Sequence, residues 1–317
     1  MKKNFLTPTT VAVLLLIFCI SFNSCKKDEV YNPERKIKKI YEKFEDSPRY
    51  LQQEWTWDEN KLMRIDYYYH GNNNIENSEY YTYEENKLTK VEDNEGYFQI
   101  SYTGFKYSKI EYFKKDDNLL IASWDFSYRN NKVSKIILTY DYSFWIPDKI
   151  GRGGFLSSLI SKDFISAIEN SAKEQTKGSS YPKAVTLTYK YNGDNIKEEK
   201  WKTDNTGGLT DMVVFYKSYD KMLSPFHKHV GLMNFESFVV PFSIDLVTSK
   251  SNPLEVQKLP TEGLMKEITY KYSYKYDNNF PIEVEVTKIS VYRTGYHSNY
   301  TYYPDITNCY KTYYEYE

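Results

Sequence analysis

The sequence predicts a mainly β protein: an antiparallel up-and-down β-barrel or strongly curled meander sheet of repeated hairpins, with one or two helical inserts plugging or capping it. Three observations lead to this fold class. Long runs alternate between apolar and polar residues, a short phrase recurs between these runs, and Asn-rich corners lie inside the phrase.

The alternating runs have the period of half-buried antiparallel strands. Residues 266–276 are the clearest case, because Ile268 and four tyrosines fall on one face and Glu, Thr, Lys and Ser fall on the other. Residues 185–191 and 124–128 alternate in the same way. We expect the aromatic face of each run to be buried.

The recurring phrase is an aromatic residue, four polar or turn-forming residues, Leu or Val, one further residue, Lys or Arg, and then Ile or Val. Copies span 57–65, 83–91, 102–110, 128–136 and 276–284, with degenerate copies at Tyr191 and Tyr219. Asn and Asp tolerate left-handed backbone, so the predicted corners are Glu59-Asn60, Glu85-Asn86, Asn130-Asn131 and Asn278-Asn279. Each phrase is therefore predicted to be a hairpin.

The number of hairpins bears on closure of the sheet. About seven hairpins imply roughly a dozen or more strands, and an open sheet of that size must curl, split or close. Closure into a barrel would remove the exposed edges.

Two inserts interrupt the hairpins, near 147–180 and 224–262. Residues 154–172 carry apolar residues at helical spacing, and residues 232–246 form an apolar stretch broken by Pro241. The inserts either complete the core as plugs, or one of them forms a movable lid over a ligand cavity, with Gly151, Gly153 and Gly154 as its hinge.

The N-terminus predicts export. Residues 1–24 have a basic start and a short apolar stretch at 11–20, which is typical of a signal peptide. Phe22 to Cys25 resembles a lipobox, so Cys25 is the predicted lipid attachment site and 25–34 a tether. Cys309 then remains alone, and no intrachain disulfide is expected.

The phrase at 57–62 is similar to the tyrosine-aspartate (YD) repeat of bacterial shell-forming proteins, with Asn in place of the usual Gly. Together with the lipobox, the Lys26-Lys27-Asp28-Glu29 that follows it and the tyrosine-rich runs, the chain resembles Bacteroidetes outer-membrane lipoproteins of unknown function with a porin-like barrel. The resemblance implies one domain over 35–317 and an outer-membrane, lipid-anchored, surface-exposed address. It implies no chemistry.

A spanning barrel would also alternate, but with apolar residues toward lipid. Here the apolar face is rich in Tyr, and the chain ends Tyr314 to Glu317, whereas outer-membrane barrels resemble one another in a terminal Phe or Trp. We therefore expect aromatic residues inside and Lys, Glu and Thr in water.

No residue pattern predicts catalysis, a cofactor or a metal. The four histidines are His70, His227, His229 and His297, and the pair at 227 and 229 lacks a third ligand. Gly151 to Gly154 matches no phosphate-binding motif, and Cys309 has no identifiable base. Acid pairs such as Asp116-Asp117 and Glu198-Glu199 could serve a glycosidase only with the right geometry.

Charge and composition limit the classes of partner that the protein is expected to bind. Removal of residues 1–24 takes two lysines and no acid, so the formal net charge moves from −1 to −3, and no nucleic-acid partner is expected. The 34 Tyr, 17 Phe and 5 Trp suit strand pairing first, and also glycan or protein interfaces.

We therefore predict a non-enzymatic envelope lipoprotein, held at the membrane by its lipid anchor, that binds a glycan, another small ligand or an envelope protein. The alternatives are a structural or assembly component without a ligand and, last, a polysaccharide hydrolase.

Overall fold

The computed structural model describes residues 33–44, 46–69, 74–140, 184–203, 212–227, 249–260, 267–294 and 301–317. These residues form sixteen strands and no helix: β1 Ile37–Phe44, β2 Tyr50–Asp58, β3 Lys61–Tyr68, β4 Ile75–Glu84, β5 Lys87–Glu92, β6 Gly96–Thr103, β7 Lys106–Lys114, β8 Leu120–Arg129, β9 Lys132–Tyr140, β10 Ala184–Asn192, β11 Asn195–Thr203, β12 Met212–Leu223, β13 Ser251–Pro260, β14 Glu267–Asp277, β15 Phe280–Thr294 and β16 Thr301–Tyr316. Within these ranges no helix is long and apolar enough to cross a membrane.

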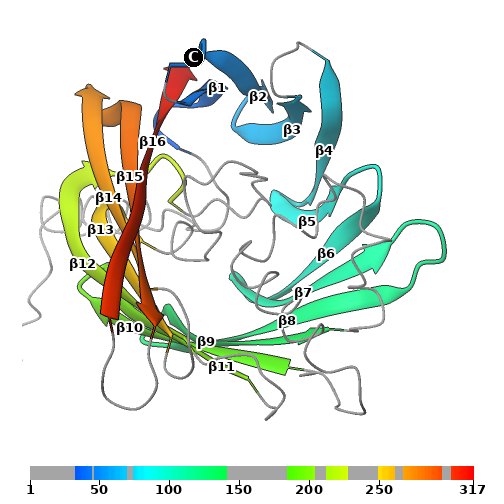
Figure 1. The fold of residues 1–317 in the computed structure, drawn as a ribbon. Helices are drawn as coiled ribbons and strands as arrows, with labels where there is room; N and C mark the ends of the chain where they lie inside the picture. The colour runs from blue at the N-terminus through cyan, green and yellow to red at the C-terminus, as the bar shows by residue number, and fades with distance from the viewer. Residues whose placement is uncertain are drawn as a thin grey trace, which may run out of the picture.

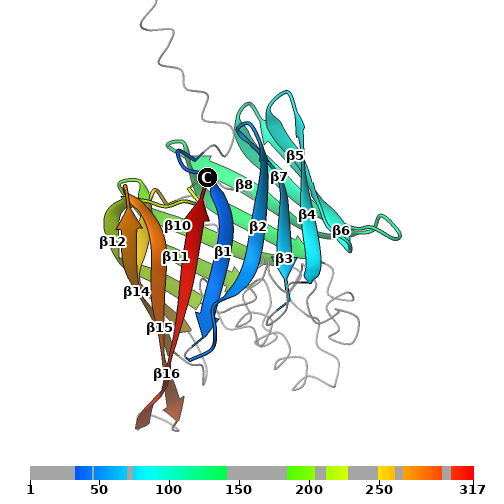
Figure 2. The same cartoon turned by 90° about the horizontal axis from the view of Figure 1, so that it is seen from above.

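The strands form a closed barrel in chain order, and each strand is antiparallel to its neighbours (Figure 1). The ring closes where β1 pairs with β16, with Ile40 opposite Tyr314 and Phe44 opposite Tyr310. The predicted up-and-down barrel is therefore confirmed, and the curled open sheet is not what forms. Strands β15 and β16 extend past their neighbours at one end (Figure 2).

Tight corners join the strands at the positions predicted from the phrase. Two-residue corners separate β2 from β3, β4 from β5, β8 from β9 and β14 from β15. Glu85, Asn86, Asn130, Asn131, Asn278 and Asn279 all have φ between 47° and 69°, the left-handed region that Asn tolerates. Gly104 and Gly193 supply the same conformation at the corners that follow β6 and β10.

The recurring aromatic residue ties each hairpin to the one before it. Its polar tip donates to a main-chain carbonyl near the start of the preceding odd-numbered strand, at 2.7–3.0 Å: Trp57 to Ile37, Tyr83 to Leu62, Tyr102 to Leu88 and Tyr191 to Val133. After four of the corners a lysine lies over the next aromatic ring, with Nζ 5.2–5.7 Å from the ring centroid: Lys61 over Tyr83, Lys87 over Tyr102, Lys106 over Tyr128 and Lys132 over Tyr191. Several copies of the phrase therefore make the same contacts with a neighbouring hairpin.

Two sequence predictions need adjustment. The copy at Tyr219 is not a hairpin, because Tyr219 lies within β12, which continues to Leu223. Residues 251–260, inside the limits predicted for the second insert, form β13. The helical stretch at 154–172, the apolar stretch at 232–246 and the glycines at 151–154 lie outside the described residues.

The aromatic faces point into the barrel, as predicted. Phe226, in the turn after β12, packs against Trp55 of β2 and Tyr314 of β16, with ring centroids 6.5 and 5.9 Å away. These strands are not neighbours of β12, so the contacts run through the interior. One buried cluster includes rings from all around the barrel, among them Phe98, Tyr112, Tyr270 and Tyr310.

The outward-facing positions carry ion pairs between neighbouring strands. Lys39 and Glu54 lie 3.2 Å apart, Lys190 and Glu198 2.9 Å, Lys275 and Glu283 3.0 Å, and Lys311 and Glu285 3.2 Å. A wall that faces acyl chains would carry an apolar band at these positions. The described outer wall therefore suits water.

Candidate functional site

Polar side chains interrupt the aromatic inner wall on β2 to β5. We call Gln53, Tyr67, Asn77, Glu79 and Asp93 the inner polar cluster; all five are at most 9% exposed. The strand register brings them together, with Gln53 opposite Tyr67 and Tyr67 opposite Asn77. Tyr80 pairs with Glu92, so Glu79 and Asp93 occupy the next opposed positions, on the inner face.

Glu79 is a fully buried carboxyl group held by two phenols. The Tyr81 hydroxyl donates to Glu79 Oε2 at 2.8 Å, and Tyr67 also donates to this carboxyl group. Burial raises the pKa of Glu79 well above its usual value, and the charge of Asp93 adds to this, while the two hydrogen bonds oppose it. Glu79 Oε1 has no hydrogen-bond partner in the described part of the chain.

Gln53 offers a complementary donor on the other side of Tyr67. Its Oε1 accepts from the Trp55 indole N–H at 2.9 Å, which fixes the orientation of the amide. Its Nε2 is buried and finds no acceptor among the described residues. The cluster therefore contains one spare amide donor and one spare carboxyl oxygen.

Asp93 completes the cluster at the end of β5. Its Oδ1 accepts from the main-chain N–H groups of Glu95 and Gly96, both at 2.8 Å, and its Oδ2 accepts from Asn77 Nδ2 at 3.3 Å. Burial raises the pKa of Asp93, and these hydrogen bonds only partly offset that effect. Gly96 is required here, because an added Cβ would lie against the Tyr112 hydroxyl and 2.5 Å from the Phe113 carbonyl oxygen.

The opposite wall repeats one part of this arrangement. Glu199 on β11 is fully buried; its Oε1 accepts from the Trp201 indole N–H at 2.5 Å and its Oε2 from the Tyr216 hydroxyl at 3.4 Å. Gln53 with Trp55, Glu79 with Tyr81, and Glu199 with Trp201 share a spacing of two residues. Sequence reasoning missed these pairs, although a polar residue two positions before a strand aromatic was the available signal.

Most residues singled out from the sequence lie elsewhere. Cys25, His70, His229 and His297 are outside the described residues, and so is the side chain of Cys309. Of the histidine pair considered at 227 and 229, only His227 lies within the described residues. Within the described ranges, no three His, Cys, Asp or Glu residues form a metal-binding group.

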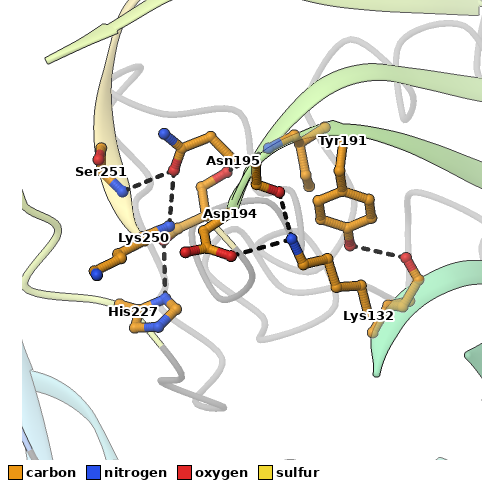
Figure 3. A network of polar contacts seen from close by, with 11 residues as sticks. Lys132, Tyr191, Asp194, Asn195, His227, Lys250 and Ser251 are labelled. Atoms are coloured by element: carbon orange, nitrogen blue, oxygen red, sulfur yellow. Dashed lines mark hydrogen bonds and ion pairs between the residues drawn. The ribbon is translucent and has the colours of Figure 1, made fainter. Parts of the chain in front are cut away.

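His227 belongs to a network that joins three corners of the barrel (Figure 3). Its Nδ1 lies 3.0 Å from the Ser249 carbonyl oxygen, so Nδ1 carries the hydrogen. Asn195 Oδ1 accepts from the main-chain N–H groups of Lys250 and Ser251, both at 3.0 Å, and Lys132 Nζ lies 3.1 Å from Asp194 Oδ1. These contacts hold the start of β13 against neighbouring hairpins.

The structure separates one of the acid pairs considered from the sequence and exposes the other. Glu198 faces outward beside Lys190 and Lys200, whereas Glu199 faces inward, so the two carboxylates lie on opposite faces. Asp116 and Asp117 lie in the exposed turn after β7.

Comparisons with known proteins add little to the fold. No protein-family model and no curated protein matches the chain. Among solved structures, a porin-like protein from Bacteroides vulgatus is similar over 90% of this chain and 99% of its own, at 11% identity and a TM-score of 0.49.

Two toxin assemblies are more distant. A complex of TcdB2, TccC3 and Cdc42 is similar over 85% of this chain and 14% of its own, at 9% identity and a TM-score of 0.30. The Tc holotoxin pore of Photorhabdus luminescens is similar over 80% of this chain and 15% of its own, at 12% identity and a TM-score of 0.27.

Proposed function

We propose that this protein is a non-enzymatic binding protein of the cell envelope, anchored in the outer membrane by lipid on Cys25 and exposed at the cell surface. Its barrel takes a small ligand, a glycan among the candidates, on the inner wall. The supporting observation is the inner polar cluster, in which spare hydrogen-bonding groups of Gln53 and Glu79 lie among aromatic rings.

The charged outer wall supports a tethered barrel over an inserted one. Ion pairs such as Lys39 with Glu54 and Lys275 with Glu283 would be costly in acyl chains, whereas they are stable in water. A barrel that does not enter the bilayer needs another attachment, and the lipobox at 22–25 supplies one.

A structural or assembly role, with an envelope protein as partner, is the second candidate. The extent of the buried cluster favours it, because inward rings from most of the strands belong to one packed cluster. In that case the inner polar groups would be satisfied by bound water rather than by a ligand.

Labelling of cells with radioactive palmitate tests the anchor and the address. We expect the full chain to be labelled and digested by protease added to intact cells, and Cys25→Ala to lose the label and leave the membrane fraction. A labelled Cys25→Ala variant, or a chain that protease cannot reach, would contradict the proposed address.

A thermal-shift screen of the full chain against small ligands tests the binding role. A ligand present at 100 times its dissociation constant stabilises the folded state by about 2.7 kcal/mol, so a true ligand raises the melting temperature measurably. No stabilisation by any glycan or small molecule would favour the structural role.

A further inference from the structure

We propose that Gln53 and Glu79, on either side of Tyr67, bind a neutral, hydroxyl-rich ligand of the saccharide type. This inference rests on the proposed binding function and names the class of ligand and the residues that contact it. It goes beyond the aromatic content, because it depends on two particular atoms of the inner wall.

The register places the two groups close together on the same face. Gln53 on β2 is opposite Tyr67 on β3, and Glu79 on β4 is opposite Ile65, two residues before Tyr67 on the same strand. Only β3 therefore separates them, and adjacent strands lie about 4.8 Å apart. Two such spacings, about 10 Å, therefore separate the backbones at Gln53 and Glu79, so the ligand must be about two sugar rings long to reach both groups.

The spare hydrogen-bonding capacity of these groups indicates what the ligand must carry. Gln53 Nε2 can only donate, so the ligand needs an acceptor there. Glu79 Oε1 accepts when the carboxyl group is ionised and donates when it is protonated, and a hydroxyl group satisfies either form. Leaving such groups buried without partners destabilises the folded protein, and a bound ligand that pairs with them would remove this cost.

The charges around the site select against ions. The charge of Asp93, which acts on Glu79, disfavours an anion. Burial favours the neutral form of Glu79, and the Gln53 amide presents its positive end, so a cation gains little. The indole ring of Trp55 and the phenol ring of Tyr81 belong to the buried aromatic cluster beside these groups, and such rings pack well against the C–H faces of sugars. Neutral saccharides combine these features.

Both groups are buried, so the wall must open before a ligand reaches them. Phe226, in the turn after β12, packs on the Trp55 ring with the two ring centroids 6.5 Å apart. We therefore expect slow association, as is usual when binding requires a conformational change.

The test titrates the full lipoprotein in detergent with neutral oligosaccharides, with hexylamine as a cationic probe and an oligouronate as an anionic one. Calorimetry and tryptophan fluorescence are read at equilibrium. We expect binding of a neutral oligosaccharide, and a loss of affinity of tenfold or more in both Gln53→Leu and Glu79→Leu. Thr312→Val is the matched control, because it removes another buried hydroxyl that has no partner in the described ranges, on β16. Its affinity should be unchanged.

The variants must first show wild-type circular dichroism. If a leucine variant fails to fold, Trp55→Phe replaces it. A ligand at Gln53 lies beside Trp55, so the change in tryptophan emission that the wild type shows on binding should be lost in Trp55→Phe. Oligosaccharide binding with unchanged affinity in the variants, or binding of a charged probe alone, would overturn this inference and leave the proposed function standing. Failure of every probe to bind would also overturn this inference, and the proposed binding function would fall with it only if the thermal-shift screen finds no ligand either.

Discussion

Glu92 and Asp93 are consecutive acids at the end of β5, and they belong to different environments. Glu92 faces outward, where hydrogen bonds from Lys115 and Lys90, at 2.7 and 2.5 Å, lower its pKa. Asp93 faces inward, where burial raises its pKa. One step along a strand therefore moves a carboxyl group from a wall that favours its charge to a wall that disfavours it.

The same contrast holds for whole strands of the barrel. The outer wall consists of exposed ion pairs, which contribute little each, and the inner wall of rings and aliphatic side chains, whose burial supplies most of the stability. The polar residues of the proposed site lie on the inner wall, where an unpaired polar group is costly.

The largest expected effect comes from neighbours on opposite walls of β6. Phe98→Ala should lower the free energy of unfolding by about 3–5 kcal/mol, because Phe98 is 1% exposed and packs on Tyr112 with ring centroids 4.8 Å apart. Gln99→Ala, at the next and exposed position, should change it by less than about 0.5 kcal/mol. Urea denaturation monitored by circular dichroism measures both, and similar losses in the two variants would break the comparison.

A smaller effect is expected from a methyl group added at Gly96, where β6 lies close against β7. Gly96→Ala should cost about 1–3 kcal/mol, because the new Cβ meets Tyr112 and the Phe113 carbonyl oxygen. Gly104→Ala is the control, since its surroundings are open and only its left-handed φ of 63° is penalised, at roughly 1 kcal/mol. If the control loses as much as Gly96→Ala in the same denaturation assay, the close packing is not the cause.

The third prediction uses the pH dependence of stability to distinguish an acid on the inner wall from an acid on the outer wall. A buried acid with a raised pKa keeps its proton in the folded state and loses it in the unfolded state, so stability falls as pH rises above the ordinary carboxyl pKa. Glu79→Gln, which cannot ionise, should therefore reduce the fall in stability between about pH 5 and pH 8 that the wild type shows.

Glu92→Gln is the matched control for this measurement. The lowered pKa of Glu92 means that its contribution is present above the ordinary carboxyl pKa and is lost as pH falls through the folded-state value. Since Glu92 is 30% exposed, the substitution should cost less than about 1 kcal/mol at neutral pH. A Glu79→Gln variant with the pH profile of the wild type would contradict the assignment of a buried neutral carboxyl group.

The fold was predictable to a large extent because its signals are local. The alternation over 266–276 identified the buried face of β14, and Asn130-Asn131 and Asn278-Asn279 identified corners whose backbone few other residues tolerate. The Tyr219 copy shows the limit of this reasoning. Its local residues resemble the phrase, but the register with β13 carries the strand on to Leu223.

The candidate site was not predictable from the same signals. Glu79 follows an Asn and a Ser and precedes two tyrosines, and in the sequence it is one of 43 acids. Its importance comes from Asp93 opposite it and from Gln53 across β3, which are 14 and 26 positions away. No local pattern of residues predicts that these three side chains lie on the same inner wall.

The amino-acid sequence by itself determined most of the strands, their corners and the inward direction of their rings, because these follow from a period of two and from the left-handed turns that Asn and Gly allow. Only the tertiary structure decided that the sheet closes, through the pairing of β1 with β16, and which polar groups meet inside it. Closure and register depend on contacts between residues distant in the chain, and no short segment of the sequence determines the free energies of such contacts.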